Sequence, residues 1–199
     1  METVIIASGN QGKLKEFKEL MKDLAVEVKS LKDFPEIGDI EENGTTFAEN
    51  AYIKAKAVYE ATGCLSIADD SGLEVDALGG APGIYSARYA GEEKDDAANN
   101  KKLIEEMNDI PDEQRGAQFH CAIVAIDKYG HRYDAEGIVR GMILRTPQGE
   151  NGFGYDPLFY IEEFGRTTAE LSMDEKNKIS HRGQAVRQIV DILKRKVFV

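Results

Sequence analysis

A strand, a glycine-containing loop and a helix follow one another directly at the start of the chain. The β-branched run at residues 3–7 reads TVIIA and leads into SGNQGK at residues 8–13. Beyond the loop, apolar residues recur at helical spacing, namely Leu14, Phe17, Met21 and Leu24. Residues 26–28 then alternate as a second strand. This succession favours an α/β fold whose early strands are joined through helices.

The next segments predict an acidic loop, a helix and a buried strand. The loop covers residues 35–44 and carries several carboxylates. Thr46 and Glu49 have the spacing of a capping box and Gly63 suits a helix end, so a helix is expected between them. Residues 65–68 are typical of a buried strand, which we expect to end in a turn at residues 69–72, Asp-Asp-Ser-Gly.

The second half predicts a hairpin, several helices and one further strand. The hairpin strands are residues 119–126 and 138–144. A helix is expected from Asp95 or Asp96 to about Met107, a short strand at 158–161, and a last helix after Ser180. Two short helical turns are expected at the capping patterns Thr167 with Glu170 and Ser172 with Glu175. Because no linker or repeat interrupts the pattern, we expect one α/β domain over residues 1–199, with a mixed sheet.

Charge and composition exclude several classes of protein. The 36 Asp and Glu residues outnumber the 25 Lys and Arg residues, which gives a net charge of −11. Such a chain repels long polyanions, so nucleic acid is not an expected partner, although a small anion can be bound locally. No leader pattern and no apolar run near about 20 residues is present, so we expect a cytoplasmic protein without a membrane partner. The isolated Cys64 and Cys121 are expected to be free thiols.

The loop at residues 8–13 is a candidate phosphate site, because backbone N–H groups at a helix start favour anions. It differs from a Walker A motif, since Leu14 stands where Ser or Thr would hold magnesium. The alternative is that the glycines only form a tight turn.

The neighbouring carboxylates Asp69 and Asp70 are a candidate metal site. Two adjacent carboxylates are costly unless a cation neutralises them, and the acidic loop offers Glu41 and Glu42 as further ligands. Oxygen ligands of this kind suit Mg²⁺. The alternative is that these are solvated carboxylates in a turn.

A third candidate region could recognise a base. Phe153, Tyr155 and Asp156 lie on a glycine-rich loop that suits stacking, although the rings could instead cover a core edge. Lys176, His181 and Arg182 cluster near the last helix start, where they could bind an anion or carbonyl, or form ordinary surface ion pairs. Because neither a serine or cysteine nucleophile nor a histidine metal pattern is indicated, water is the expected nucleophile.

Five segments in order resemble the inosine triphosphate pyrophosphatase family, enzymes that act on non-standard purine nucleoside triphosphates. They are SGNQGKLKEF at 8–17, EENGTTFAENA at 41–51, ADDSGLEVDALGGAPGIYSARYAG at 68–91, GFGYDPLF at 152–159 and SHRGQA at 180–185. The resemblance implies an elongated mixed sheet, two lobes around a central cleft and a homodimer. It implies Mg²⁺-dependent hydrolysis of ITP, dITP and XTP to the monophosphate and pyrophosphate, which removes them from the nucleotide pool.

The resemblance also assigns roles to residues. Asp70 would accept the proton and bind metal, Glu42 or its rival Glu41 would be a second ligand, and Asp69 would assist metal or water. The triphosphate would be held by Ser8, Gly9, Asn10, Gln11, Gly12 and Lys13, and Ser71 would touch the substrate. The nucleoside end would be held by Phe153, Gly154, Tyr155, Asp156, Lys176, His181 and Arg182. A donor such as Arg182, or a backbone N–H near His181, would select the 6-oxo group.

Two other functions stay open from the sequence. A pyrophosphatase for modified pyrimidine triphosphates would use the same phosphate chemistry with another base pocket. A non-catalytic nucleotide sensor would use the loop and the aromatic residues for binding alone. Preference among ITP, dITP and XTP, the number of metal ions and tolerance of Mn²⁺ do not follow from the residues.

Overall fold

The structure is a computed structural model that describes residues 2–198, and it contains a mixed seven-stranded sheet with flanking helices. The strands follow the order β2-β1-β3-β4-β5-β6-β7 across the sheet. β1 pairs in parallel with β2 and β3, whereas β6 pairs antiparallel with β5 and β7. The strands are β1 Glu2–Ile6, β2 Val26–Ser30, β3 Leu65–Val75, β4 Gly116–Ile126, β5 Arg132–Ile143, β6 Phe159–Ile161 and β7 Arg166–Thr167. The α-helices are α1 Gln11–Leu20, α2 Phe47–Thr62, α3 Asp96–Glu106, α4 Met173–Ile179 and α5 His181–Lys196.

The chain divides into two compact units, which correspond to the two predicted lobes. The first unit comprises Met1–Asp70, Cys121–Gly137 and Arg182–Val199, and the second comprises Ser71–His120 and Ile138–His181. The single domain over residues 1–199 and the central cleft stay predictions.

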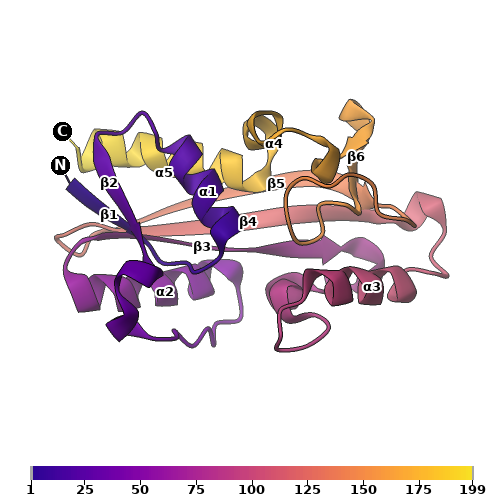
Figure 1. Cartoon of the computed structure of the whole chain (residues 1–199), viewed down its shortest axis with the longest axis horizontal. Helices are drawn as coiled ribbons and strands as arrows, with labels where there is room; N and C mark the ends of the chain where they lie inside the picture. Colours follow the sequence, from indigo (N-terminus) through magenta and orange to yellow (C-terminus); the bar gives the residue numbers. More distant parts are fainter. Residues whose placement is uncertain (1, 199) are drawn as a thin grey trace. The chain divides into compact units, whose positions relative to one another are not determined.

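The first unit has a hydrophobic core on each face of its part of the sheet. In β1, Val4 and Ile6 lie in the core that contains residues of α1 and α5, whereas Ile5 lies in the core that contains residues of α2. Figure 1 shows α1 and α5 on one side of these strands and α2 on the other. Successive side chains of a strand point to opposite faces, so a strand covered on both sides is apolar throughout. The TVIIA run is therefore explained by burial on two faces.

The second unit has its own core. Leu103 and Met107 of the α3 region pack with Leu73 of β3, and Phe119 of β4 contacts Phe159 of β6 with ring centroids 4.4 Å apart. This core anchors α3.

Local signals placed most helix ends correctly. Thr46 caps α2 by accepting from Glu49 N, and Gly63 ends it in a left-handed conformation. Asp95 caps α3, and α5 begins directly after Ser180. Both later capping boxes are present, at Thr167 and at Ser172.

Two predictions about strands were wrong. β3 continues to Val75, so residues 69–72 form strand and not the expected turn. The predicted hairpin is present, but its second strand begins at Arg132 and not near Ile138. Its turn is closed by Asp127 N, which donates to His131 O at 3.0 Å. In both places the polar residues resemble a turn in the sequence, but a strand can carry polar side chains wherever they find partners.

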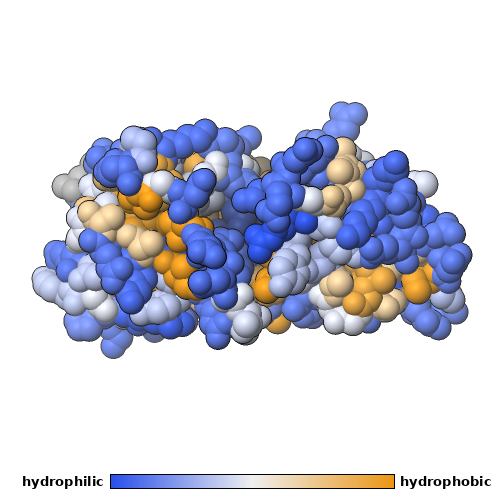
Figure 2. Space-filling model, turned by 90° about the horizontal axis from the view of Figure 1, so that it is seen from below, coloured by the Kyte–Doolittle hydropathy of each residue, from blue (hydrophilic) through white to orange (hydrophobic). Residues whose placement is uncertain are grey.

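The face shown in Figure 2 is predominantly hydrophilic, with hydrophobic residues in separate patches. Both cysteines are free, with Cys121 buried and Cys64 partly buried. Within residues 2–198, no helix is long and apolar enough to cross a membrane.

Candidate active site

The glycine loop forms the N-terminal cap of α1. Asn10 is the cap residue, and its Oδ1 accepts from Lys13 N at 3.1 Å. Ser8 Oγ accepts from Asn10 N at 3.1 Å, and Gln11 Nε2 donates to Gly9 O at 3.3 Å. Gln11, Gly12 and Lys13 form the first turn of the helix, where backbone N–H groups lack intrahelical acceptors. A helix start of this kind favours an anion, and the phosphate site at this loop stays a prediction.

Asp69 faces the side of β3 that carries this loop. It is fully buried, and its Oδ2 lies 3.0 Å from Lys13 Nζ and 3.3 Å from Arg182 Nε. Burial alone would raise the pKa of Asp69, but Lys13 and Arg182 outweigh burial and hold the pKa below its ordinary value. Asp69 is therefore an ionised anchor for Lys13 at the predicted phosphate loop.

Arg182 lies in the interior and not on the surface. Its side chain is 2% exposed and pairs with Glu16 of α1 as well as with Asp69. Burial would lower the pKa of Arg182, but the carboxylates of Glu16 and Asp69 raise it overall. The ordinary surface ion pair considered for Arg182 is therefore wrong, and its predicted contact with the base stays a prediction.

Asp70 faces the opposite side of β3, toward α2. Asn50 Nδ2 donates to Asp70 Oδ2 at 3.1 Å, and Asn50 Oδ1 accepts from Gly44 N at 2.8 Å. Asn50 is itself buried, so one amide joins the end of the acidic loop to the carboxylate. A Cβ on Gly44 would lie 2.7 Å from Asn50 Oδ1, which explains why glycine is needed there.

Lys54 joins Asp70 to Glu42. Its Nζ lies 2.6 Å from Glu42 Oε1 and 3.7 Å from Asp70 Oδ1, and it donates to Asp69 O at 2.7 Å. Burial raises the pKa of Asp70 above its ordinary value, although Lys54 opposes this effect. Glu41 is exposed, whereas Glu42 is partly buried and pairs with Lys54.

The pair of Asp70 and Glu42 fits the donor set that Mg²⁺ needs. Lys54 already places one cation against both carboxylates, so their oxygens converge on a common position. Within residues 2–198, no three His, Cys, Asp or Glu side chains are grouped to hold a metal by themselves. Mg²⁺ usually takes one or two carboxylates and completes its shell with water and substrate phosphate. Asp69, which pairs with Lys13 and Arg182, lies on the other face of the strand.

In the second unit, Phe153, Asp156 and Lys176 come together. Lys176 Nζ lies 2.7 Å from Asp156 Oδ2 and 4.8 Å from the centre of the Phe153 ring. Asp156 also accepts from Phe153 N at 2.9 Å and from Thr168 Oγ1 at 2.8 Å. The buried carboxylate thus binds both the backbone N–H of Phe153 and the Lys176 ammonium.

The remaining predicted residues of this unit have different surroundings. Tyr155 is buried in the core, and its hydroxyl donates to Ser86 O at 2.6 Å, so the reading of this ring as part of the core holds. The His181 ring stacks on Phe119 with centroids 4.8 Å apart. Ser71 lies partly buried within β3.

Comparison with known proteins decides the family. Residues 4–192 match the model of the Ham1 family. The chain belongs to the Ham1 family.

Its Ham1 relatives match over nearly their whole length. The chain is 52% identical over 192 residues to the dITP/XTP pyrophosphatase of Desulforamulus reducens, covering 96% of each protein. It is 51% identical over 191 residues to the dITP/XTP pyrophosphatase of Bacillus cereus, covering 95% of this chain and 93% of the relative. Among solved structures, a HAM1 protein from Coxiella burnetii is similar with a TM-score of 0.88 and 44% identity, covering 98% of this chain and 100% of the other.

Sequence reasoning missed three side chains of this Ham1 protein that surround the two carboxylates of β3. Asn50 and Lys54 are four residues apart, which places them on one face of α2. That spacing, next to the apolar Ala51 and Ala55, is the sequence signal that could have indicated that both side chains face the interior. The sequence carries no such signal for Glu16, because a glutamate in the middle of an amphipathic helix usually lies on its exposed face.

Proposed function

We propose that this Ham1 protein hydrolyses dITP, XTP and ITP to the nucleoside monophosphate and pyrophosphate. The observation that carries the proposal is β3, which presents Asp70 to Glu42 and Lys54 on one face and Asp69 to Lys13 on the other. The relatives of the same length named dITP/XTP pyrophosphatase support the substrate class.

The residues of the first unit suit cleavage between the α and β phosphates. The N–H groups at the start of α1, together with Lys13, would hold phosphate oxygens. Asp70 would orient a water and take one of its protons, because its raised pKa makes it a better base than Asp69. The water oxygen would bond to the α phosphorus, and the electron pair of the broken bond would leave with pyrophosphate.

Mg²⁺ would be held by Asp70 and Glu42 together with substrate phosphate. When bound, it would neutralise the charge that develops on the leaving pyrophosphate. Lys54 keeps these two carboxylates near one another, and Asn50 holds Asp70 Oδ2 so that Oδ1 faces the shared position.

The second unit suits the purine. Phe153 offers a ring for stacking, and the Lys176 ammonium lies over that ring, 4.8 Å from its centre. An ammonium donor favours the 6-oxo group of hypoxanthine and xanthine over the 6-amino group of adenine. Discrimination against GTP would come from a donor that faces position 2. We further propose a cytoplasmic homodimer, which light scattering after size exclusion would test.

The test is the product released from dITP with Mg²⁺. Wild-type protein should release pyrophosphate, whereas Asp70→Asn should lose turnover and still bind the nucleotide. Orthophosphate as the first product would contradict the proposal, and near-normal activity of Asp70→Asn would remove Asp70 from its role. A panel with XTP, GTP, ATP and a modified pyrimidine triphosphate separates the purine reading from the pyrimidine one. Binding without release of any product would indicate a nucleotide sensor.

A further inference from the structure

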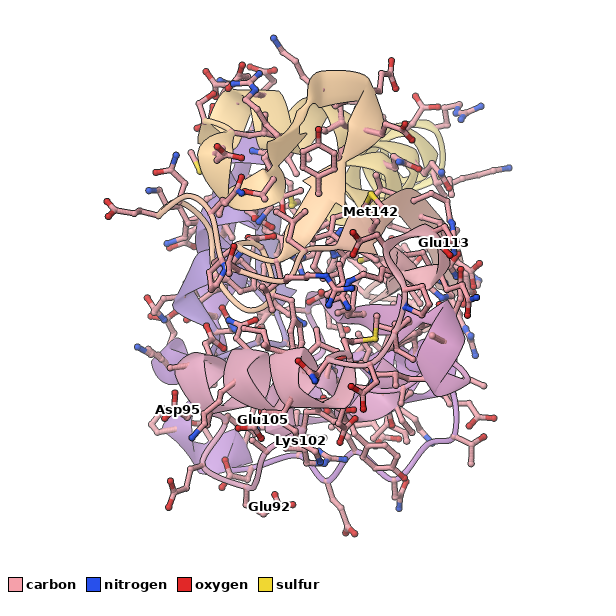
Figure 3. All side chains as sticks on the ribbon, turned by 90° about the vertical axis from the view of Figure 1, so that its right-hand side faces the viewer. Glu92, Asp95, Lys102, Glu105, Glu113 and Met142 are labelled. Atoms are coloured by element: carbon pink, nitrogen blue, oxygen red, sulfur yellow. The ribbon has the colours of Figure 1, made fainter. Side chains whose placement is uncertain are left out.

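The loop that carries Phe153 is held from outside by α3. Gly154 N donates to Asp96 Oδ2 at 2.8 Å, and Asn100 Nδ2 donates to Gly154 O at 2.9 Å. Asp96 and Asn100 are one helical turn apart, so both lie on the same side of α3. Both hydrogen-bonding groups of one glycine are therefore bound by a single helix. Figure 3 shows α3 in the foreground, with Asp95 at its start.

This glycine needs an external restraint. Gly154 has φ +61, and no atom lies within 4 Å of the position that a Cβ would occupy. Neither a side chain nor close packing at that position limits its backbone, and glycine has more conformational freedom to lose than any other residue. The two bonds from α3 supply the missing restraint.

The helix that supplies these bonds is itself rigidly placed. Leu103 and Met107 are fully buried in the core of the second unit. The adjacent Asn99 binds another segment in the same way, since its Oδ1 accepts from Ala90 N at 2.7 Å and its Nδ2 donates to Ala87 O at 2.9 Å. A binding group is best positioned when its support is fixed by packing and by further hydrogen bonds.

The orientation of the Asn100 amide shows that a donor is required. Its Nδ2 binds Gly154 O, whereas its Oδ1 is buried and has no hydrogen-bond partner among the described residues. An aspartate of the same shape would place a carboxylate oxygen against the carbonyl oxygen of Gly154. Asp96 has the opposite requirement, because it accepts from an N–H group.

We propose that Asp96 and Asn100 are positioning residues that clamp Gly154 and thereby hold the adjacent Phe153 ring where a purine base stacks. The inference rests on the proposed function for the identity of the ligand. Inside the loop, Asp156 restrains Phe153 N and Lys176 Nζ, and the clamp from α3 restrains the next residue. Loss of the clamp should weaken base binding and leave the phosphate chemistry of the first unit unchanged.

Two substitutions of equal shape test the clamp, because they should have opposite outcomes. Asn100→Asp removes the donor and should raise KM for dITP about 5- to 10-fold, the effect of one net hydrogen bond, with kcat within about twofold. Asp96→Asn keeps an acceptor and should stay within about twofold of wild type, whereas Asp96→Ala should behave like Asn100→Asp. Asn100→Asp also adds a negative charge. Asn100→Ala removes the donor without adding a charge, so it separates the two effects. Lys101→Ala, at an exposed site on the same helix, is the matched control.

Two further measurements separate positioning from general damage. Inhibition by inorganic pyrophosphate should be unchanged in every variant, since it reports the phosphate end alone. Amide exchange over residues 152–156, measured without nucleotide, should accelerate in Asn100→Asp and Asn100→Ala. An unchanged KM for dITP in both Asn100 variants, or a parallel loss of pyrophosphate inhibition, would overturn the inference.

A failure of the proposed function would give a different experimental result from a failure of the clamp. Wild-type protein that released no pyrophosphate from dITP would contradict that function. The clamp would then be judged by the Kd for dITP, which should still rise about 5- to 10-fold in Asn100→Asp. An unchanged Kd, or no binding of dITP by wild type, would overturn the inference as well.

Discussion

Removal of the Glu16 carboxylate should destabilise the first unit more than a typical substitution does. The Arg182 guanidinium is 2% exposed and pairs with Glu16 and Asp69, and Asp69 is shared with Lys13. Glu16→Ala takes a full negative charge away from a buried cation, and breaking such a pair costs about 3–5 kcal/mol. For a protein of this size the loss corresponds to a fall in Tm of roughly 6–20 °C.

Urea unfolding followed by far-UV circular dichroism measures this effect. The matched control is Glu105→Ala, which breaks the exposed pair with Lys101 at 3.9 Å and should cost less than about 1 kcal/mol. The double variant Glu16→Leu/Arg182→Met should be more stable than Glu16→Ala, because it leaves no buried cation without this partner. If Glu16→Ala were no less stable than Glu105→Ala, the reasoning from burial would be refuted.

Three further predictions concern other parts of the molecule. Gly152→Ala places a Cβ 2.1 Å from Asp156 Oδ2 in a backbone with φ +75, so it should lower Tm and raise KM for dITP in a nucleotide titration. Asp127 accepts from the backbone of Tyr129 and His131, and these bonds outweigh burial and lower its pKa. Its charge therefore stabilises the folded state above about pH 4 and ceases to do so as the pH falls. Asp127→Asn should accordingly cost about 1–3 kcal/mol in urea unfolding at pH 7 and less at pH 3, and an equal cost at both would contradict this account. Chelation by EDTA should abolish pyrophosphate release, and added Mg²⁺ should restore it; activity that persists in EDTA would argue against a metal at Asp70.

Local interactions explain which parts of the fold were predictable. The cap at Thr46, the glycine at the end of α2 and the capping box at Ser172 each involve residues within four positions of one another. Their partners are visible in the sequence, and so are those of the loop that caps α1. The partners of Glu16 and Asn100 are 166 and 54 positions away. Nothing in a local pattern specifies such distant pairs, which is why the buried ion pair and the clamp from α3 emerged only with the tertiary structure.

The adjacent carboxylates of β3 show how one wrong local assumption changes a chemical interpretation. From the sequence, Asp69 and Asp70 are expected in a turn, where a common cation would neutralise both. Because β3 continues through them, their side chains point to opposite faces, and each meets its own partners. Lys13 and Arg182 lower the pKa of Asp69, whereas burial raises the pKa of Asp70 despite Lys54. The strand thus gives two identical side chains different surroundings, and the raised pKa of Asp70 and its shared contact with Lys54 and Glu42 support the proposal that Asp70, rather than Asp69, takes a proton from water.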